Sequence, residues 1–149
     1  NDLGRISQYG SVEVTKYQMI HKYSKIMHIC SQVESNIRPD MDSLDAIKSV
    51  LPAGTLSGAP KIRACEIIDE LEPVPRGIYG GALGYVDFGG NMDTCIAIRM
   101  AVKKNNKVYV QAGGGIVADS VPANEYQESA NKAKAVMLAI ENAKEAVRI

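Results

Sequence analysis

The 149-residue chain lacks an excess of charge of either sign, and this absence narrows the partners that it can bind. Its 17 basic residues balance 17 acidic residues, and no basic block is present that could neutralise phosphates. Nucleic-acid binding is therefore disfavoured. No apolar run approaches the length of about 20 residues that a membrane-spanning helix needs, so a membrane location is disfavoured as well.

Cysteine is also scarce. Cys30, Cys65 and Cys95 are isolated and odd in number, with neither zinc-ligand spacing nor a disulfide framework. We therefore expect a reducing, cytoplasmic environment. The first five residues do not form a signal peptide. Because the chain starts at Asn1 without Met or an N-terminal element of its own, we expect it to be a piece from the C-terminal side of a longer protein.

The remaining sequence predicts an α+β fold with an antiparallel sheet and packed helices, because runs of strands and helices do not alternate as βαβ units. We expect a buried strand at 26–30, with a helix as the alternative for so short an apolar run. We expect helices at 44–51, 61–71 and 122–147. Three further strands at 78–87, 93–102 and 107–112 predict an antiparallel meander. The predicted helix caps are Asp40 or Ser43 for the first helix, Ser57 for the second, and Asp119 or Ser120 for the third. Pro60 is predicted to lie in the first turn of the second helix.

The last predicted helix carries three charged side chains on one face. At about 100° per residue, Glu125, Glu128 and Lys132 fall within roughly 60° of one another. The same arc continues through apolar residues, namely Ala135, Val136, Ala139 and Ala143. Because buried charges are costly unless they are paired or hold a ligand, we expect this helix end to face the interior as part of a metal site. The alternative is a polar first turn that favours the helix dipole.

The predicted strand 93–102 carries one candidate for anion binding. Arg99 lies among small residues on the face opposite the predicted core face of Ile96 and Ile98. Arginine is the preferred bidentate partner of a carboxylate, so this room indicates an anion site. An arginine that extends to solvent is the alternative interpretation.

Two glycine-containing loops resemble phosphate-binding motifs only superficially. Gly113-Gly114-Gly115 lacks the following strand and acidic residue that a dinucleotide site needs, and residues 54–61 fail the pattern of an ATP-binding loop. Glycines at 113–115 still allow backbone N–H groups to approach an anion such as a carboxylate, with a plain turn as the alternative. Thr55 is a loop hydroxyl able to contact a ligand, or a turn residue. His28 lies in an apolar run, where a structural core histidine is the alternative to a functional one.

Several motifs in sequence order resemble one family. They are residues 52–61 (PAGTLSGAPK), 76–85 (RGIYGGALGY), 92–99 (MDTCIAIR), 111–120 (QAGGGIVADS), 125–128 (EYQE) and 131–133 (NKA). Across nearly all 149 residues the chain resembles the chorismate-utilising enzymes, and among them the large subunits of anthranilate synthases. The match corresponds to the C-terminal part of that family's α/β sandwich, so residues 1–149 are expected to form one incomplete catalytic domain.

The resemblance implies a lyase of tryptophan biosynthesis that converts chorismate and ammonia to anthranilate and pyruvate. It implies Mg²⁺ held by Glu128 and Glu125, and a glutamine amidotransferase subunit that supplies ammonia. Substrate-binding roles fall on Tyr79 and Arg99 for the enolpyruvyl carboxylate, on Gly113-Gly114-Gly115 for a carboxylate, and on Lys132 for nearby charge. His28 would act near the departing hydroxyl, and Thr55 would contact the ring.

The family places further metal-site glutamates upstream of Asn1, so the chain is expected to carry half of a metal site and to be inactive alone. We also expect exposed apolar surface and an oligomer or self-associating chain. Two alternatives stay open. One is an aminodeoxychorismate synthase component of the folate pathway, and the other is a non-catalytic interaction module.

Overall fold

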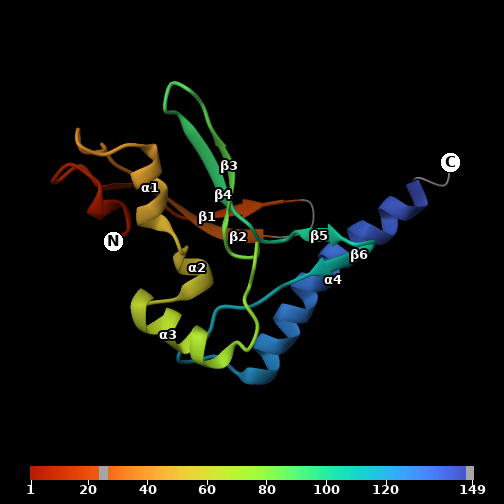
Figure 1. The fold of residues 1–149 in the computed structure, drawn as a ribbon. Coiled ribbons are helices and arrows are strands. Elements are labelled where there is room, and N and C mark those ends of the chain that lie inside the picture. The colour runs from red at the N-terminus through yellow and green to blue at the C-terminus, as the bar shows by residue number, and fades with distance from the viewer. Residues whose placement is uncertain (24–26, 147–149) are drawn as a thin grey trace. The chain divides into compact units, whose positions relative to one another are not determined.

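The computed structural model describes residues 1–23 and 27–146, and Figure 1 shows the elements in chain order. These elements are η1 (Leu3–Arg5), β1 (Glu13–Lys22), β2 (Met27–Glu34), α1 (Ser43–Val50), α2 (Gly54–Ser57), α3 (Lys61–Leu71), β3 (Ala82–Val86), β4 (Met92–Ile96), β5 (Ala101–Lys104), β6 (Lys107–Val110) and α4 (Pro122–Ala146). The mixture of helices and antiparallel strands confirms the α+β prediction.

The chain divides into two compact units. The first holds residues 1–51 and 84–94, and the second holds residues 52–83 and the chain from residue 95 onward. The β3–β4 hairpin contributes its outer part to the first unit and its base to the second. The predicted strands therefore do not form one meander in the described residues, where β1–β2, β3–β4 and β5–β6 are separate two-stranded sheets.

The first unit is built on the β1–β2 hairpin. Ile20 lies opposite Ile29 and His21 opposite His28, with register shifts nearer the start of β1. The sequence predicted a buried strand here, but the side chains of β2 are exposed except for the half-buried Cys30. Residue 26, where that prediction began, lies outside the described residues. The pairing of strands is thus set by the backbone ladder rather than by a core.

In the same unit, two buried residues, Ile6 and Ser7, hold the N-terminal segment in place. Ile6 and Ser7 are both buried, and the Ser7 hydroxyl donates to the Leu3 carbonyl at 2.5 Å. Helix α1 begins after Asp42, whose carboxylate accepts from two backbone N–H groups, while Asp45 bonds back to the Asp42 N–H. This capping box replaces the predicted caps at Asp40 and Ser43, because Asp42 is the residue with extended backbone before the first turn.

The second unit begins with α2 and α3. Helix α3 spans the predicted residues 61–71, but Ser57 does not cap it; its hydroxyl donates to the Ala53 carbonyl within α2. Arg76 joins the two helices, because it donates to the Leu56 carbonyl at 2.6 Å and makes two hydrogen bonds to Glu72. Those bonds hold the pKa of Glu72 below its ordinary value.

The predicted strand 93–102 is interrupted. Strand β4 ends at Ile96 and β5 begins at Ala101, and the intervening Arg99 has a left-handed backbone with φ of 54°. The Ile98 N–H donates to the Ile96 carbonyl at 2.9 Å, which closes a tight turn. This turn breaks the simple alternation of faces that the sequence pattern predicted.

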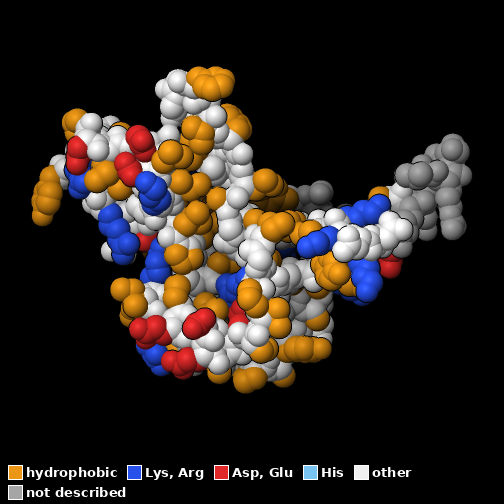
Figure 2. Space-filling model, in the orientation of Figure 1, with side chains coloured by type: hydrophobic (Ala, Val, Ile, Leu, Met, Phe, Trp, Pro, Cys, Tyr) orange, Lys and Arg blue, Asp and Glu red, His pale blue; other side chains and the backbone are white. Residues whose placement is uncertain are grey.

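Little apolar surface is buried in either unit. Ile6 and Ala97 are the buried hydrophobic residues of the described chain, and many large apolar side chains are exposed. Figure 2 shows hydrophobic side chains over much of the visible face. The expectation of exposed apolar surface is confirmed. None of the described helices combines the length and hydrophobicity that crossing a membrane requires.

Candidate functional site

The start of α4 and the glycine loop before it bring several predicted site residues together. Glu125 and Glu128 lie one turn apart on α4, and Lys132 forms an ion pair with Glu128. The Lys132 ammonium also donates to the Gly113 carbonyl, at 3.4 Å. Lys132, which the sequence predicted as a site residue, therefore joins α4 to the glycine loop.

The face of α4 that turns inward differs from the predicted face. Glu125 and Lys132 are half-buried, but the side chain of Glu128 is 54% exposed. Of the predicted apolar stripe, Val136 is half-buried and the three alanines are exposed, whereas the inward face also includes Ser129, Ala133 and Ile140. The prediction was right for Glu125, Lys132 and Val136 and wrong for Glu128 and the three alanines. Alanine is small enough to occur on any face of a helix, so it is a poor guide to the buried face.

The glycine loop approaches the helix closely at Gly114. A Cβ at this position would lie 3.3 Å from Oε2 of Glu125 and 3.5 Å from the Ser129 hydroxyl. A side chain there would displace the end of the Glu125 side chain by a few tenths of an ångström, so glycine lets the loop lie directly against this carboxylate. At Gly115, by contrast, a Cβ would have no neighbouring atom within 4 Å, and this glycine is exposed.

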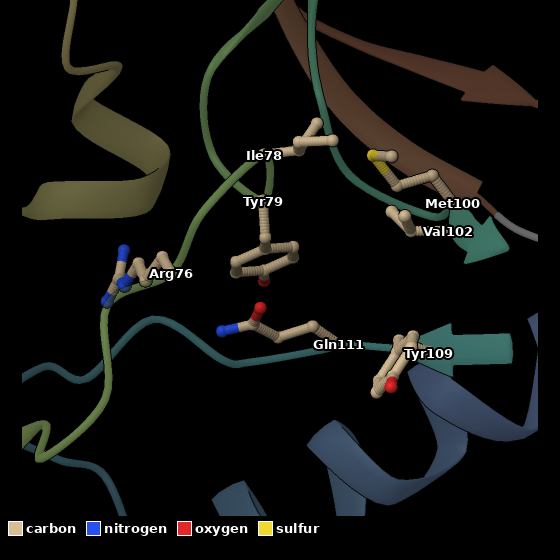
Figure 3. Close-up of a pocket in the computed structure, with 7 residues that line it drawn as sticks. All are labelled: Arg76, Ile78, Tyr79, Met100, Val102, Tyr109 and Gln111. Atoms are coloured by element: carbon tan, nitrogen blue, oxygen red, sulfur yellow. The ribbon is translucent and has the colours of Figure 1, made fainter. Parts of the chain in front are cut away.

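Gly113 lies beside Tyr79, because a Cβ at Gly113 would be 3.4 Å from the Tyr79 hydroxyl. The tyrosine also lines a pocket of about 160 Å³ in the second unit (Figure 3). The other lining residues are Arg76, Ile78, Met100, Val102, Tyr109 and Gln111. The Tyr79 hydroxyl and the Gln111 carboxamide point toward each other in this view. Tyr109 in β6 and Gln111 just after it were not predicted as site residues, because a single aromatic or polar residue at such a position carries no distinctive signal.

Charge favours an ionised Glu128. The hydrogen bond and the charge of Lys132 lower the pKa of this carboxyl, and the charge of Arg99 lowers it further. Arg99 is itself half-buried in the turn between β4 and β5. Two cations thus act on one carboxylate, although its exposure to solvent screens both interactions.

No hydrogen bond or ion pair among the described residues joins Thr55 or His28 to this cluster. Thr55 is exposed in the first turn of α2, and no hydrogen bond from its side chain to another described residue is present. His28 belongs to the first unit, where it is exposed in β2 and its ring meets that of Tyr23 edge-on with 6.3 Å between centroids. The alternative of a structural core histidine is therefore wrong, and the functional role of His28 stays a prediction.

The carboxylates of Glu125 and Glu128 are the candidate Mg²⁺ ligands of this site. Mg²⁺ prefers oxygen ligands and is commonly held by one or two carboxylates plus substrate oxygens. Within the described part of the chain, the Glu125 carboxylate has no hydrogen bond or ion pair, and it lies against Gly114. The same residues contain no group of three or more histidine, cysteine or acidic side chains that could enclose a metal.

Comparison with known protein families identifies the family of this chain. The model of the chorismate binding enzyme family matches residues 1–138. The chain belongs to the chorismate binding enzymes. This family membership confirms the resemblance carried by the motifs at 52–61, 76–85 and 111–120.

Curated relatives in this family are highly similar over the whole chain. Anthranilate synthase component 1 of Pseudomonas aeruginosa is 58% identical over 147 residues, which are 99% of this chain and 30% of that protein. The Aquifex aeolicus protein of the same name is 55% identical over 145 residues, or 97% of this chain and 29% of that protein. The chain therefore spans about 30% of the length of these relatives.

Solved structures show the same fold. Anthranilate synthase component I from Streptococcus pneumoniae gives a TM-score of 0.86 at 53% identity, covering 91% of this chain and 31% of that one. A Bacillus anthracis protein described as a putative 2,3-dihydroxybenzoate-specific isochorismate synthase gives 0.83 at 26% identity, covering 94% and 37%. This chain thus shares the fold of the part of each structure that it covers, which is about a third of the neighbour's length.

Proposed function

We propose that this chain is a catalytic part of an anthranilate synthase component 1. The whole protein would convert chorismate and ammonia to anthranilate, pyruvate and water in tryptophan biosynthesis, in the cytoplasm. A glutamine amidotransferase partner, component 2, would supply the ammonia. The observation that carries this proposal is 55–59% identity, over nearly the whole chain, to relatives named anthranilate synthase component 1.

Carboxylate recognition is the first role of the site. Chorismate carries a ring carboxylate and an enolpyruvyl carboxylate, so its site needs cations and N–H donors. Tyr79 and Arg99 would hold the enolpyruvyl carboxylate, and the backbone of residues 113–115 would donate to a carboxylate. The openness at Gly115 and the contact between Tyr79 and Gly113 support these roles. Lys132 would add positive charge beside the loop.

The reaction would require that the C4 hydroxyl of chorismate leaves and that the charge of its ring carboxylate is neutralised. Ammonia would add at C2 while the C4 hydroxyl leaves with a proton, and elimination of pyruvate would then give the aromatic product. His28 would donate to the departing hydroxyl, and Thr55 would contact the ring. Mg²⁺, held by Glu125 and Glu128, would supply the charge that neutralises the ring carboxylate.

A chimaera tests the proposal. Residues 1–149 would replace the matching 147-residue segment of the Pseudomonas aeruginosa protein. We expect the purified chimaera to form fluorescent anthranilate from chorismate, ammonium and Mg²⁺, and from glutamine once component 2 is added. A folded chimaera that makes isochorismate, aminodeoxychorismate or no product would overturn the assignment.

The isolated chain should behave differently from the chimaera. Because it spans about 30% of the relatives' length, we expect no anthranilate from residues 1–149 alone with chorismate, Mg²⁺ and ammonium. Measurable turnover by the isolated chain would show that the proposed half-site is sufficient, contrary to this proposal.

A further inference from the structure

Lys132 is placed to do more than add charge beside a substrate. Its ammonium forms the ion pair with Glu128 and donates to the Gly113 carbonyl at 3.4 Å. The side chain of Lys132 is 24% exposed, whereas that of Glu128 is 54% exposed. The Lys132 ammonium therefore lies between the Gly113 carbonyl and the Glu128 carboxylate, and the carboxylate is the more exposed of the two charged groups.

The two carboxylates of the helix differ in their partners. Glu128 is paired with the ammonium of Lys132. Glu125, one turn earlier, lies against Gly114 without an ion pair in the described residues. A divalent cation would meet an available carboxylate at Glu125 and a carboxylate already paired with a cation at Glu128.

We propose that Lys132 is an internal cation that occupies Glu128 until a divalent metal ion displaces it, and that Glu125 receives this ion first. The inference rests on the proposed function, because that function makes the two glutamates metal ligands. No covalent bond changes in the exchange. The ammonium leaves Glu128 and keeps its hydrogen bond to the Gly113 carbonyl, so metal binding would turn the lysine charge toward the glycine loop.

Binding of Mn²⁺ to the purified 149-residue chain tests the exchange, measured as loss of the free-ion EPR signal. Lys132→Met removes the competing charge and should tighten Mn²⁺ binding roughly threefold to tenfold. Lys134→Met removes the same charge from the exposed side of α4 and should change the affinity by less than about twofold. Lys132→Arg keeps a cation and should behave like the unchanged chain.

The order of binding has its own test. In the Lys132→Met background, Glu125→Gln should weaken Mn²⁺ binding more than Glu128→Gln does. Far-UV circular dichroism establishes that each variant keeps its helix, and Lys132→Gln replaces the Met variant if that one unfolds.

Three results would overturn the inference: equal effects of the changes at 132 and 134, weaker binding after loss of Lys132, or no Mn²⁺ binding by any variant. These titrations contain no chorismate. An inactive chimaera beside a tighter Lys132→Met chain would therefore remove the proposed function alone, and an active chimaera with no such tightening would remove this inference alone.

Discussion

The β1–β2 hairpin and the start of α4 hold predicted site residues in two different ways. In the hairpin, backbone pairing sets the position of His28 opposite His21, and its ring contacts only the edge of Tyr23 among described aromatic rings. At the start of α4, side chains contact one another and the loop, as Lys132 does with Glu128 and with the Gly113 carbonyl. Backbone pairing thus sets where His28 lies along its strand, whereas side-chain contacts between α4 and the loop set the distances among Lys132, Glu128 and Gly113.

This difference predicts where substitutions act. A side chain on an exposed ladder can be replaced with little effect on folding, so any loss of activity there reports chemistry. A side chain in the α4 cluster also positions its neighbours, so its loss should change ligand binding and local structure together. Activity is measured in the chimaera, and stability and association are measured in the isolated chain.

The largest effect is expected at His28. In the chimaera, His28→Gln removes the proposed proton donor and should lower kcat by about 10² to 10⁴, with little change in KM. The matched control is His21→Gln, which changes the opposite position of the ladder and should leave kcat within about twofold. Steady-state kinetics at saturating Mg²⁺ measures both. Equal losses at the two positions would mean that the hairpin contributes structure rather than chemistry.

The next effect is expected at Glu128. In the chimaera, Glu128→Gln removes one of the two proposed metal carboxylates and should lower activity about 100-fold while raising the Mg²⁺ concentration for half-maximal rate. Glu141→Gln makes the same charge change on an exposed part of α4 and should have little effect. Unchanged Mg²⁺ dependence in the Glu128 variant would remove this residue from the metal site.

The helices were the most predictable part of the fold. Helix α3 spans the predicted residues 61–71, and α4 begins at the predicted Pro122. Prolines and apolar periodicity mark such boundaries locally. The caps were less predictable, because whether Asp42 rather than Asp40 accepts the first N–H groups depends on backbone dihedral angles that composition does not reveal.

The interruption at Arg99 and the inward face of α4 could not be predicted in the same way. The alternating pattern at 93–102 is compatible with a continuous strand, and a hydrogen bond across two residues with one left-handed residue is enough to break it. The proximity of Gly114 to Glu125 depends on how the loop meets the helix. Residue types suggested the site, and tertiary contacts determined which of them meet.

Exposed apolar side chains of the hairpin predict association of the isolated chain. Ile20 and Ile29 face each other across the ladder and are 65% and 73% exposed. We expect residues 1–149 to self-associate, and Ile20→Thr with Ile29→Thr to weaken association about tenfold. Sedimentation equilibrium measures this, with Ile62→Thr on α3 as a control of similar exposure. A clean monomer at high concentration would contradict the expectation.

The smallest effect concerns pH and the ion pairs of the second unit. Arg76 lowers the pKa of Glu72 below 4.5, so the stabilisation from this pair is present above about pH 4.5 and is lost as pH falls through the lowered pKa. Because Glu72 is 40% exposed, we expect a contribution of about 0.5 kcal/mol or less. Denaturant unfolding at pH 6 and pH 3 should show a smaller loss for Glu72→Gln than for the unchanged chain.

Glu13→Gln provides the control from the hairpin, because Glu13 lies in the exposed strand β1 and has no ion pair within the described residues. It should lose as much stability between pH 6 and pH 3 as the unchanged chain does. If the Glu13 variant instead matched Glu72→Gln, acid sensitivity would come from the net charge of the chain rather than from contacts of the second unit. The two regions, one held by its backbone ladder and the other by side-chain contacts, would then not differ in how their acidic residues make stability depend on pH.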